Sequence, residues 1–274
     1  MEEKLETKSD FIKKVAASTR KKEELFDQSK AHYFVRAMYA GAMLVFATAG
    51  GAYAADALNK INPNLGKFGF SFIFAFGLVW ILYLHHELVT SNMMYLTASC
   101  YHKIITPPKA LSILLFCTLG NITGAVLAGL LIGNTSPFQA LTADSFILTV
   151  LDGKLTKEVG LIFLEAIAAN IFVNIAILGF ILTKSEMAKI FMVLTAIFLF
   201  VYLSYEHVVA NFAITGIAWF TNVGVSYSLG HILFTWLVAW LGNYVGGGLI
   251  MGLVYGWYND CLLYTSDAAD DMQC

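Results

Sequence analysis

Two polar stretches interrupt long apolar segments of this chain: HHELVTSN at residues 85–92 and SYEHVVAN at residues 204–211. Each has a glutamate followed by valine two positions later and by asparagine five positions later. A second pattern, LGNITGAVL at 119–127, returns in the same order as LGNYVGGGL at 241–249. The two patterns recur at nearly the same offset, which predicts a duplicated structural unit.

The composition of the chain places most of it in lipid. Hydrophobic residues make up 58% of the 274 residues, charged residues make up 13%, and the mean hydropathy is +0.68. A soluble domain has about 25% charged residues, so a nucleic-acid-binding protein, a disordered chain and a disulfide-rich secreted domain are excluded. A span needs roughly 20 helical residues. Six spans are predicted, at 34–58, 68–100, 111–133, 159–182, 190–220 and 229–258.

The second and fifth predicted spans are too long for one crossing and contain the two polar stretches. We therefore expect an all-α membrane protein in which these two helices are broken at mid-membrane. A unit of three spans is inverted when it is repeated, so the chain is predicted to form two inverted three-helix repeats. Broken helices in inverted repeats line a transport path near the midplane, because exposed backbone is tolerated only in a protein-lined or wet cavity.

The ends of the chain are predicted to differ from its centre. Residues 1–30 are charged and carry Phe11, Ile12, Val15 and Ala16 at helical spacing, which is typical of an amphipathic helix at a membrane surface. A loosely ordered basic tail explains the same residues equally well. Residues 31–260 form the predicted six-span transport domain. Residues 261–274 begin with CLLYTSDAAD, which matches a translated sequencing adapter codon by codon, so we interpret them as an artefact.

Lysine and arginine residues predict the orientation. Most of those in the connecting segments lie on the side of the N-terminus, and such residues are enriched in cytoplasmic loops. A multi-pass cell-membrane protein with both termini in the cytoplasm is therefore expected.

Ionisable residues within spans are costly and mark functional sites. Glu87 and Glu206 occupy equivalent positions, where a carboxylate either caps freed N–H groups of its own loop, the favoured interpretation, or relays protons. His207 has no counterpart in the first copy, where Leu88 stands. This asymmetry suggests a functional role, with Thr90 as hydrogen-bond partner; the alternative is a histidine that bridges buried polar groups.

At these residues the chain resembles the formate/nitrite transporter family, over about residues 31–259. YEHVVAN at 205–211 is similar to the family's (F/Y)EHxxAN loop, and ELVTSN at 87–92 is similar to its (D/E)L(F/V)T(G/S)N loop. The resemblance implies an aquaporin-like fold, a homopentamer and transport of a small monovalent anion. It departs from the family at His85-His86, where a small residue or glycine pair usually stands.

The resemblance also implies roles for individual residues. Counting from the two loops, Phe74, Leu78 and Phe200 fall on the family's constriction positions, although such side chains in a span usually pack in a core or face lipid. Lys154 fits an outer-vestibule lysine, which taken alone is an ordinary loop residue. The complete set of predicted substrate-binding residues is Phe74, Leu78, Thr90, Lys154, Asn170, Phe200, Glu206, His207 and Asn211.

Transport of a weak-acid anion together with a proton is the function that follows from this resemblance. Formate is the first candidate, and nitrite, hydrosulfide, acetate and lactate are the others. An anion channel and an anion/proton symporter both fit a central histidine. The alternatives are an aquaporin-like neutral-solute channel, disfavoured because neither break contains an Asn-Pro-Ala motif, a membrane di-iron enzyme, disfavoured because the six histidines are scattered, and a membrane scaffold. No enzyme activity, cofactor, metal or nucleic-acid partner is predicted.

Overall fold

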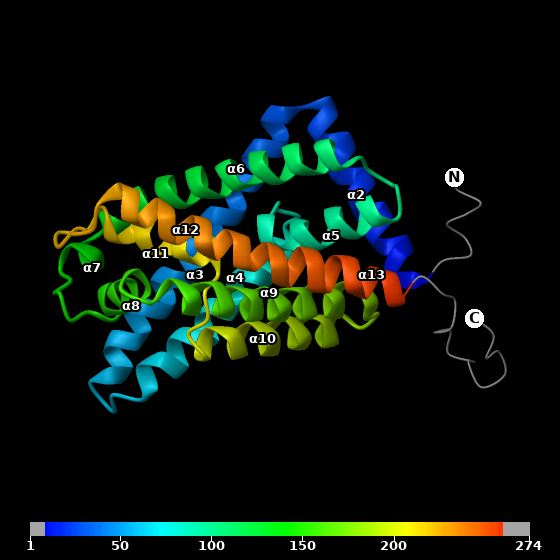
Figure 1. Ribbon diagram of the computed structural model, residues 1–274. Coiled ribbons are helices and arrows are strands. Elements are labelled where there is room, and N and C mark those ends of the chain that lie inside the picture. Colours follow the sequence, from blue (N-terminus) through cyan, green and yellow to red (C-terminus); the bar gives the residue numbers. More distant parts are fainter. Residues whose placement is uncertain (1–8, 260–274) are drawn as a thin grey trace.

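The computed structural model describes residues 9–259, in which all regular structure is helical (Figure 1). The predicted adapter residues 261–274 lie outside the described residues. Twelve helices follow one another along the described chain: α2 (Asp10–Gln28), α3 (Lys30–Asn59), α4 (Leu65–Tyr83), α5 (Val89–Tyr101), α6 (Pro107–Gly133), α7 (Ser136–Gln139), α8 (Phe146–Leu155), α9 (Val159–Leu182), α10 (Glu186–Tyr202), α11 (Val208–Ala218), α12 (Leu229–Asn243) and α13 (Tyr255–Tyr258), with the π-helical turns η1 (Tyr244–Val254) joining the last two.

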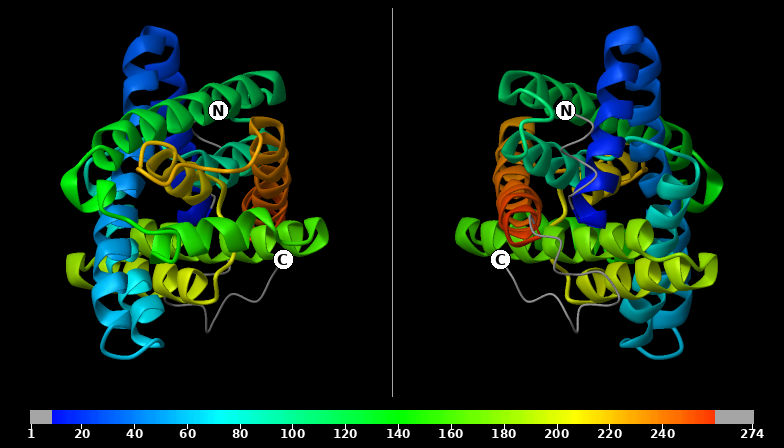
Figure 2. Two further views of the ribbon diagram at one scale, coloured as in Figure 1. Left: turned by 90° about the vertical axis from the view of Figure 1, so that its left-hand side faces the viewer. Right: turned by 90° about the vertical axis from the view of Figure 1, so that its right-hand side faces the viewer.

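Five helices of the described chain are long and apolar enough to cross a membrane: α3, α4, α6, α9 and the continuous helix Leu229–Tyr258. The segment predicted as the fifth span, residues 190–220, is divided into α10 and α11, of 17 and 11 residues, and neither reaches that length alone. Five such helices identify a multi-pass membrane protein. Figure 2 shows α5 and α11 enclosed by the longer helices, and every residue of α11 is buried.

The chain leaves helical conformation within both polar stretches, between Tyr83 and Val89 and between Tyr202 and Val208. The two loops share one backbone pattern. His85 and Ser204, each two residues before a glutamate, have φ values of 57° and 60°. This left-handed region is unfavourable for residues with a side chain. The next amide in each loop donates to a carbonyl five residues earlier, at 2.9 Å for His86 and 3.1 Å for Tyr205.

An asparagine in a neighbouring helix holds each loop. The Asn121 side-chain amide donates to the carbonyl of Glu87 at 2.8 Å, and its oxygen accepts from the amide of Val89 at 3.0 Å. Asn243 makes the matching bonds, to the carbonyl of Glu206 at 3.0 Å and from the amide of Val208 at 2.9 Å. Buried backbone groups without partners are costly, so these asparagines stabilise the two loops.

A glycine in each of the two LGN patterns lies at a close contact between two helices. A Cβ atom on Gly124 in α6 would overlap the carbonyl oxygen of Met38 in α3, and one on Gly246 in η1 would overlap that of Ile167 in α9. Glycine at such crossings lets helix backbones approach closely, as is common in membrane bundles. These glycines belong to the repeated LGN patterns, so the patterns bring Asn121 and Asn243 against their loops.

Helix α2 packs against the bundle, where it contacts α3, α5 and α9. The four apolar residues noted in the sequence, Phe11, Ile12, Val15 and Ala16, are all buried, and the ring of Phe11 lies 4.9 Å from that of Tyr255 in α13. Thr19 adds a hydrogen bond of 2.8 Å between its hydroxyl and that of Ser99. The predicted apolar face of α2 therefore packs against the helices of the bundle.

Candidate functional site

The N-terminal ends of α5 and α11 meet at the centre of the bundle. Thr90, in the first turn of α5, places its Oγ1 atom 2.8 Å from Nε2 of His207, the residue that caps α11. Thr90 is fully buried and His207 is 2% exposed. Helix N-termini carry partial positive charge, so both helices favour negative charge near this contact.

The hydrogen bonds of His207 assign its neutral tautomer. The backbone amide of Ala210 donates to His207 Nδ1 at 3.2 Å, so Nδ1 must be the unprotonated nitrogen. A neutral imidazole then carries its proton on Nε2, and this proton is donated to Thr90 Oγ1. The site thus presents one N–H donor and one hydroxyl at the same point.

Three apolar side chains predicted as a constriction are all buried: Phe74 at 2%, Leu78 at 3% and Phe200 at 2% exposure. The rings of Phe74 and Phe200 meet edge to face, with centroids 6.4 Å apart. The Phe200 ring also lies 5.7 Å from the imidazole of His207. Phe200 therefore lies beside the Thr90–His207 pair.

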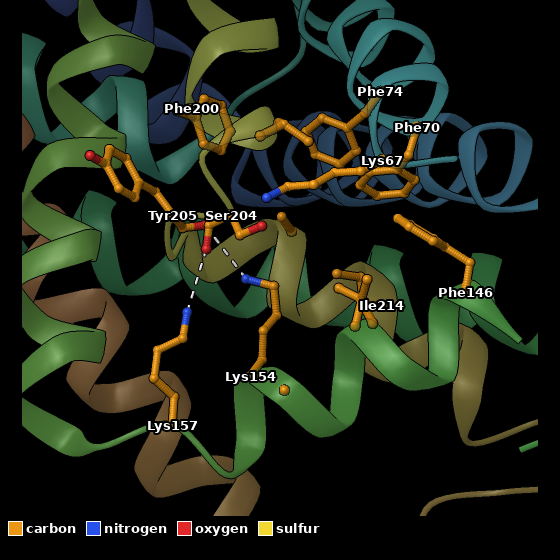
Figure 3. A pocket seen from close by; sticks show the side chains of 14 residues that line it. Lys67, Phe70, Phe74, Phe146, Lys154, Lys157, Phe200, Ser204, Tyr205 and Ile214 are labelled. Carbon is orange, nitrogen blue, oxygen red and sulfur yellow. Dashed lines mark hydrogen bonds between the residues drawn. The ribbon is translucent and has the colours of Figure 1, made fainter. Parts of the chain in front are cut away.

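A cavity of about 240 Å³ lies on the side of α8 and is lined by residues of α4, α8, α10 and α11. We call it the α8 cavity. Its lining includes Phe74 and Phe200, whereas His207 is not part of it. Phe200 thus borders both this cavity and the imidazole of His207. Figure 3 shows the two rings with the lysines of the cavity.

Two lysines beside the α8 cavity neutralise the buried carboxylate of Glu206. Lys154 Nζ lies 3.0 Å from Glu206 Oε2, and Lys157 Nζ lies 2.6 Å from Oε1. The side-chain amide of Asn211 donates to the same carboxylate at 2.9 Å. Burial favours the neutral amine of Lys157, but the carboxylates of Glu206 and Glu165 outweigh it and raise the pKa of this loop lysine. A buried charge needs such partners.

An equivalent arrangement surrounds Glu87, with a lysine from α2. Lys22 Nζ lies 2.8 Å from Glu87 Oε2, and the side-chain amide of Asn92 donates to the same oxygen at 2.9 Å. The hydroxyl of Tyr33 donates to it at 3.3 Å. The central Thr90–His207 pair therefore lies between two lysine–glutamate pairs, one at the α2 end and one at the α8 end.

Asn170 contacts the backbone that carries the central pair. Its side-chain amide lies 3.2 Å from the carbonyl oxygen of Thr90 and 2.7 Å from that of Asn243. Asn170 is fully buried and is not part of the α8 cavity lining. In this structure it holds the start of α5 against the end of α12.

Of the predicted residues, Leu78 is shown only to be buried. The others are connected by the contacts described above, and the structure adds partners that the sequence did not single out. In the sequence, Lys22, Lys67 and Lys157 differ in no way from the other lysines of the N-terminal segment and the connecting segments. Glu87 and Glu206 indicate from the sequence that cationic partners are needed, because a buried carboxylate requires a cation. They do not say which of the 17 basic residues supplies it. In residues 9–259 no group of three or more His, Cys, Asp or Glu residues is placed to hold a metal ion.

Comparison with known proteins shows the family of this chain. The family model described as "Formate/nitrite transporter" matches residues 9–257. The chain belongs to the formate/nitrite transporter family. The matched residues include both loops, both lysine–glutamate pairs and His207, and the family identifies the protein as a channel-like transporter.

Relatives of the family come from bacteria and a parasite. The nitrite transporter NirC of Escherichia coli is 27% identical over 256 residues, which cover 91% of each chain. The formate-nitrite transporter of Plasmodium falciparum is 26% identical and covers 83% of this chain and 79% of its own. An uncharacterised transporter, YwcJ of Bacillus subtilis, is 24% identical over 89% of this chain and 95% of its own.

Two solved structures share the fold. An FNT family ion channel superposes with a TM-score of 0.84 at 27% identity, covering 91% of this chain and 98% of its own. A pentameric formate channel with formate bound superposes with a TM-score of 0.74 at 21% identity, covering 84% of this chain and 97% of its own. The helical arrangement is therefore that of known channels.

Proposed function

We propose that this chain carries small monovalent weak-acid anions, formate first among them, across the membrane through the Thr90–His207 pair. The observation that carries this proposal is the meeting of two helix N-termini at a buried N–H and hydroxyl pair. Such a site favours an anion or a polarised acid. Nitrite, hydrosulfide, acetate and lactate share the single charge and the weak-acid chemistry.

The proposed pathway uses six spans arranged as two inverted three-helix repeats. In this arrangement α4 and α5 form the second span and α10 and α11 form the fifth, each broken at mid-membrane. The matched φ values of His85 and Ser204, and the matched bonds of Asn121 and Asn243, support an equivalence of the two halves. Inverted repeats with broken helices place substrate at the midplane.

The proposed assembly is a homopentamer in the cell membrane with both termini in the cytoplasm. A solved relative is described as pentameric, and the excess of Lys and Arg residues on the side of the N-terminus supports the orientation. Helices α2 and α13 lie at one end of the bundle and α8 lies at the other (Figure 1). In this orientation the α8 cavity is the outer vestibule.

Charge and burial suggest how the pathway selects its substrate. Lys154 attracts the anion into the vestibule, an effect that salt weakens. Phe74, Leu78 and Phe200 then form an apolar barrier that a bare anion crosses only at high energetic cost, whereas a protonated acid crosses readily. The Nε2–H group of His207 donates a hydrogen bond to the substrate, which takes the place of the bond to Thr90 Oγ1. Both a channel and a symporter use this site, and the number of protons moved per anion distinguishes them.

The experiment is uptake of labelled formate, nitrite, hydrosulfide and lactate into proteoliposomes between about pH 5 and pH 8. Wild-type protein is compared with His207→Ala and with His32→Ala, a control histidine at the exposed start of α3. We expect anion flux that rises with acidity, a changed pH profile in His207→Ala only, and little permeation of water or glycerol. A folded wild-type protein without anion flux contradicts the proposed function, and unchanged flux in His207→Ala contradicts the role of the histidine.

A further inference from the structure

The α8 cavity is lined by three lysines, and in the described residues no carboxylate side chain belongs to the lining. Lys154 ends α8 and Lys157 follows it, whereas Lys67 comes from the first turn of α4. Figure 3 shows Lys67 reaching into the cavity from the opposite wall to Lys154 and Lys157. The cavity therefore has cationic side chains on two sides.

These lysines differ in their carboxylate partners. Lys154 is paired with Glu206, and Lys157 is paired with both Glu206 and Glu165. Two lysines and two carboxylates leave no net charge. Within residues 9–259, Lys67 has no carboxylate partner; its ammonium group lies 5.5 Å from the centroid of the Tyr202 ring. The unbalanced positive charge of this cavity is thus that of Lys67.

Lys67 is exposed, but apolar side chains lie on one side of it. The rings of Phe70 and Phe146 lie beside it in the lining, with centroids 5.0 Å apart, so apolar groups replace water on part of the wall. An ion pair is stronger where the local dielectric is lower than that of water. An ammonium group without a carboxylate partner also keeps its three N–H donors for a ligand.

We propose that Lys67 is an anion-binding residue of this cavity, which holds the transported anion opposite Lys154 before the anion reaches Phe74 and Phe200. This inference rests on the proposed transport function and adds a specific residue to it. Salt screens the attraction between the anion and the Lys67 ammonium group, so binding is strongest at low ionic strength. The ligand class is a small monovalent anion with a carboxylate-like group.

Formate uptake by three variants tests the role of Lys67. Lys67→Met removes the charge and keeps an apolar stem, Lys67→Arg keeps the charge, and Lys60→Met is the matched control. Lys60 is exposed in the connection that leads into α4 and does not line the cavity. In Lys67→Met, the formate concentration for half-maximal flux is expected to rise about three- to tenfold at low salt, and less at high salt. Lys67→Arg and Lys60→Met are expected to stay close to wild type.

Labelling of the wild-type protein gives a second test that needs no variant. An amine-reactive reagent is applied in saturating formate or in potassium sulfate of equal ionic strength, and the modified lysines are measured by mass spectrometry. We expect formate to protect Lys67 but not Lys60. Equal labelling of Lys67 in both salts, or a Lys67→Met variant that transports like Lys60→Met, overturns this inference. Absence of formate flux in the folded wild type overturns the proposed function instead.

Discussion

Thr90 Oγ1 and His207 Nε2 are 2.8 Å apart at the centre of the bundle, although the two residues lie at the starts of different helices and are 117 positions apart in the chain. Because the amide of Ala210 occupies His207 Nδ1, the Nε2 proton points at Thr90. This pairing joins α5 and α11 at their N-terminal ends, and it is the contact on which the proposed transport chemistry depends.

Substitution of Thr90 tests this contact directly. Thr90→Val keeps the shape of the side chain but leaves His207 Nε2 without an acceptor. A hydrogen bond contributes about 1 kcal/mol, so we expect roughly a fivefold change in anion flux in Thr90→Val. Thr90→Ser keeps the hydroxyl and is expected to transport at close to the wild-type rate. Equal flux through the valine and serine variants in proteoliposomes contradicts a role for the hydroxyl.

Loss of the buried carboxylate at Glu206 is expected to destabilise the protein. Glu206→Gln leaves the ammonium groups of Lys154 and Lys157 without their buried partner, and breaking a buried pair costs roughly 3–5 kcal/mol. Glu165→Gln is the matched control, because the Glu165 side chain is 24% exposed and a partly exposed pair contributes about 0–1 kcal/mol. Thermal unfolding in detergent measures both. Similar melting temperatures for the two variants argue against the buried ion pairs.

The glycine crossing of α3 and α6 is expected to be intolerant of a methyl group. In Gly124→Ala the new Cβ meets the carbonyl oxygen of Met38, and the two helices must separate. Overpacking of this kind costs typically 1–3 kcal/mol. Gly230→Ala is the control, since a Cβ there meets nothing within 4 Å. The yield of folded protein in size-exclusion chromatography should fall for the first variant only.

A contact outside the membrane has a pH dependence of known sign. The Tyr227 hydroxyl donates to the Asp152 carboxylate of α8, and this hydrogen bond raises the pKa of Tyr227 above its ordinary value. A raised pKa means that the stabilisation is present below the unfolded pKa of roughly 10 and is lost as the pH rises through the folded value. The melting temperature of wild type should exceed that of Tyr227→Phe at neutral pH.

The difference in melting temperature between wild type and Tyr227→Phe, measured at each pH, tests this prediction. The difference is used because lysines also titrate at high pH. We expect a constant difference up to about pH 9 and a shrinking one above it. A difference that does not change at high pH shows that the hydroxyl is not the donor.

The membrane character and the positions of the two loops could be read from the sequence, because they depend on local patterns of apolar and polar residues. Long apolar runs, polar residues within them and repeated Glu-x-Val-x-x-Asn and Leu-Gly-Asn patterns can be counted without knowing which helices touch. Together with the family motif, they predicted Thr90 and His207 as partners. Residues 205–211 and 87–92 were sufficient to indicate the family.

The side chains that contact these loops could not be identified without the tertiary structure. Lys22, 65 positions before Glu87, reaches it from α2, for which the sequence alone left a membrane-surface helix and a loosely ordered tail equally open. Lys67 faces Lys154 across a cavity formed by four helices, and the tautomer of His207 follows from one backbone amide. The physical reason is that ion pairs and cavities depend on how helices cross. That crossing is set by close contacts such as Gly124 on Met38, which join residues far apart in the chain.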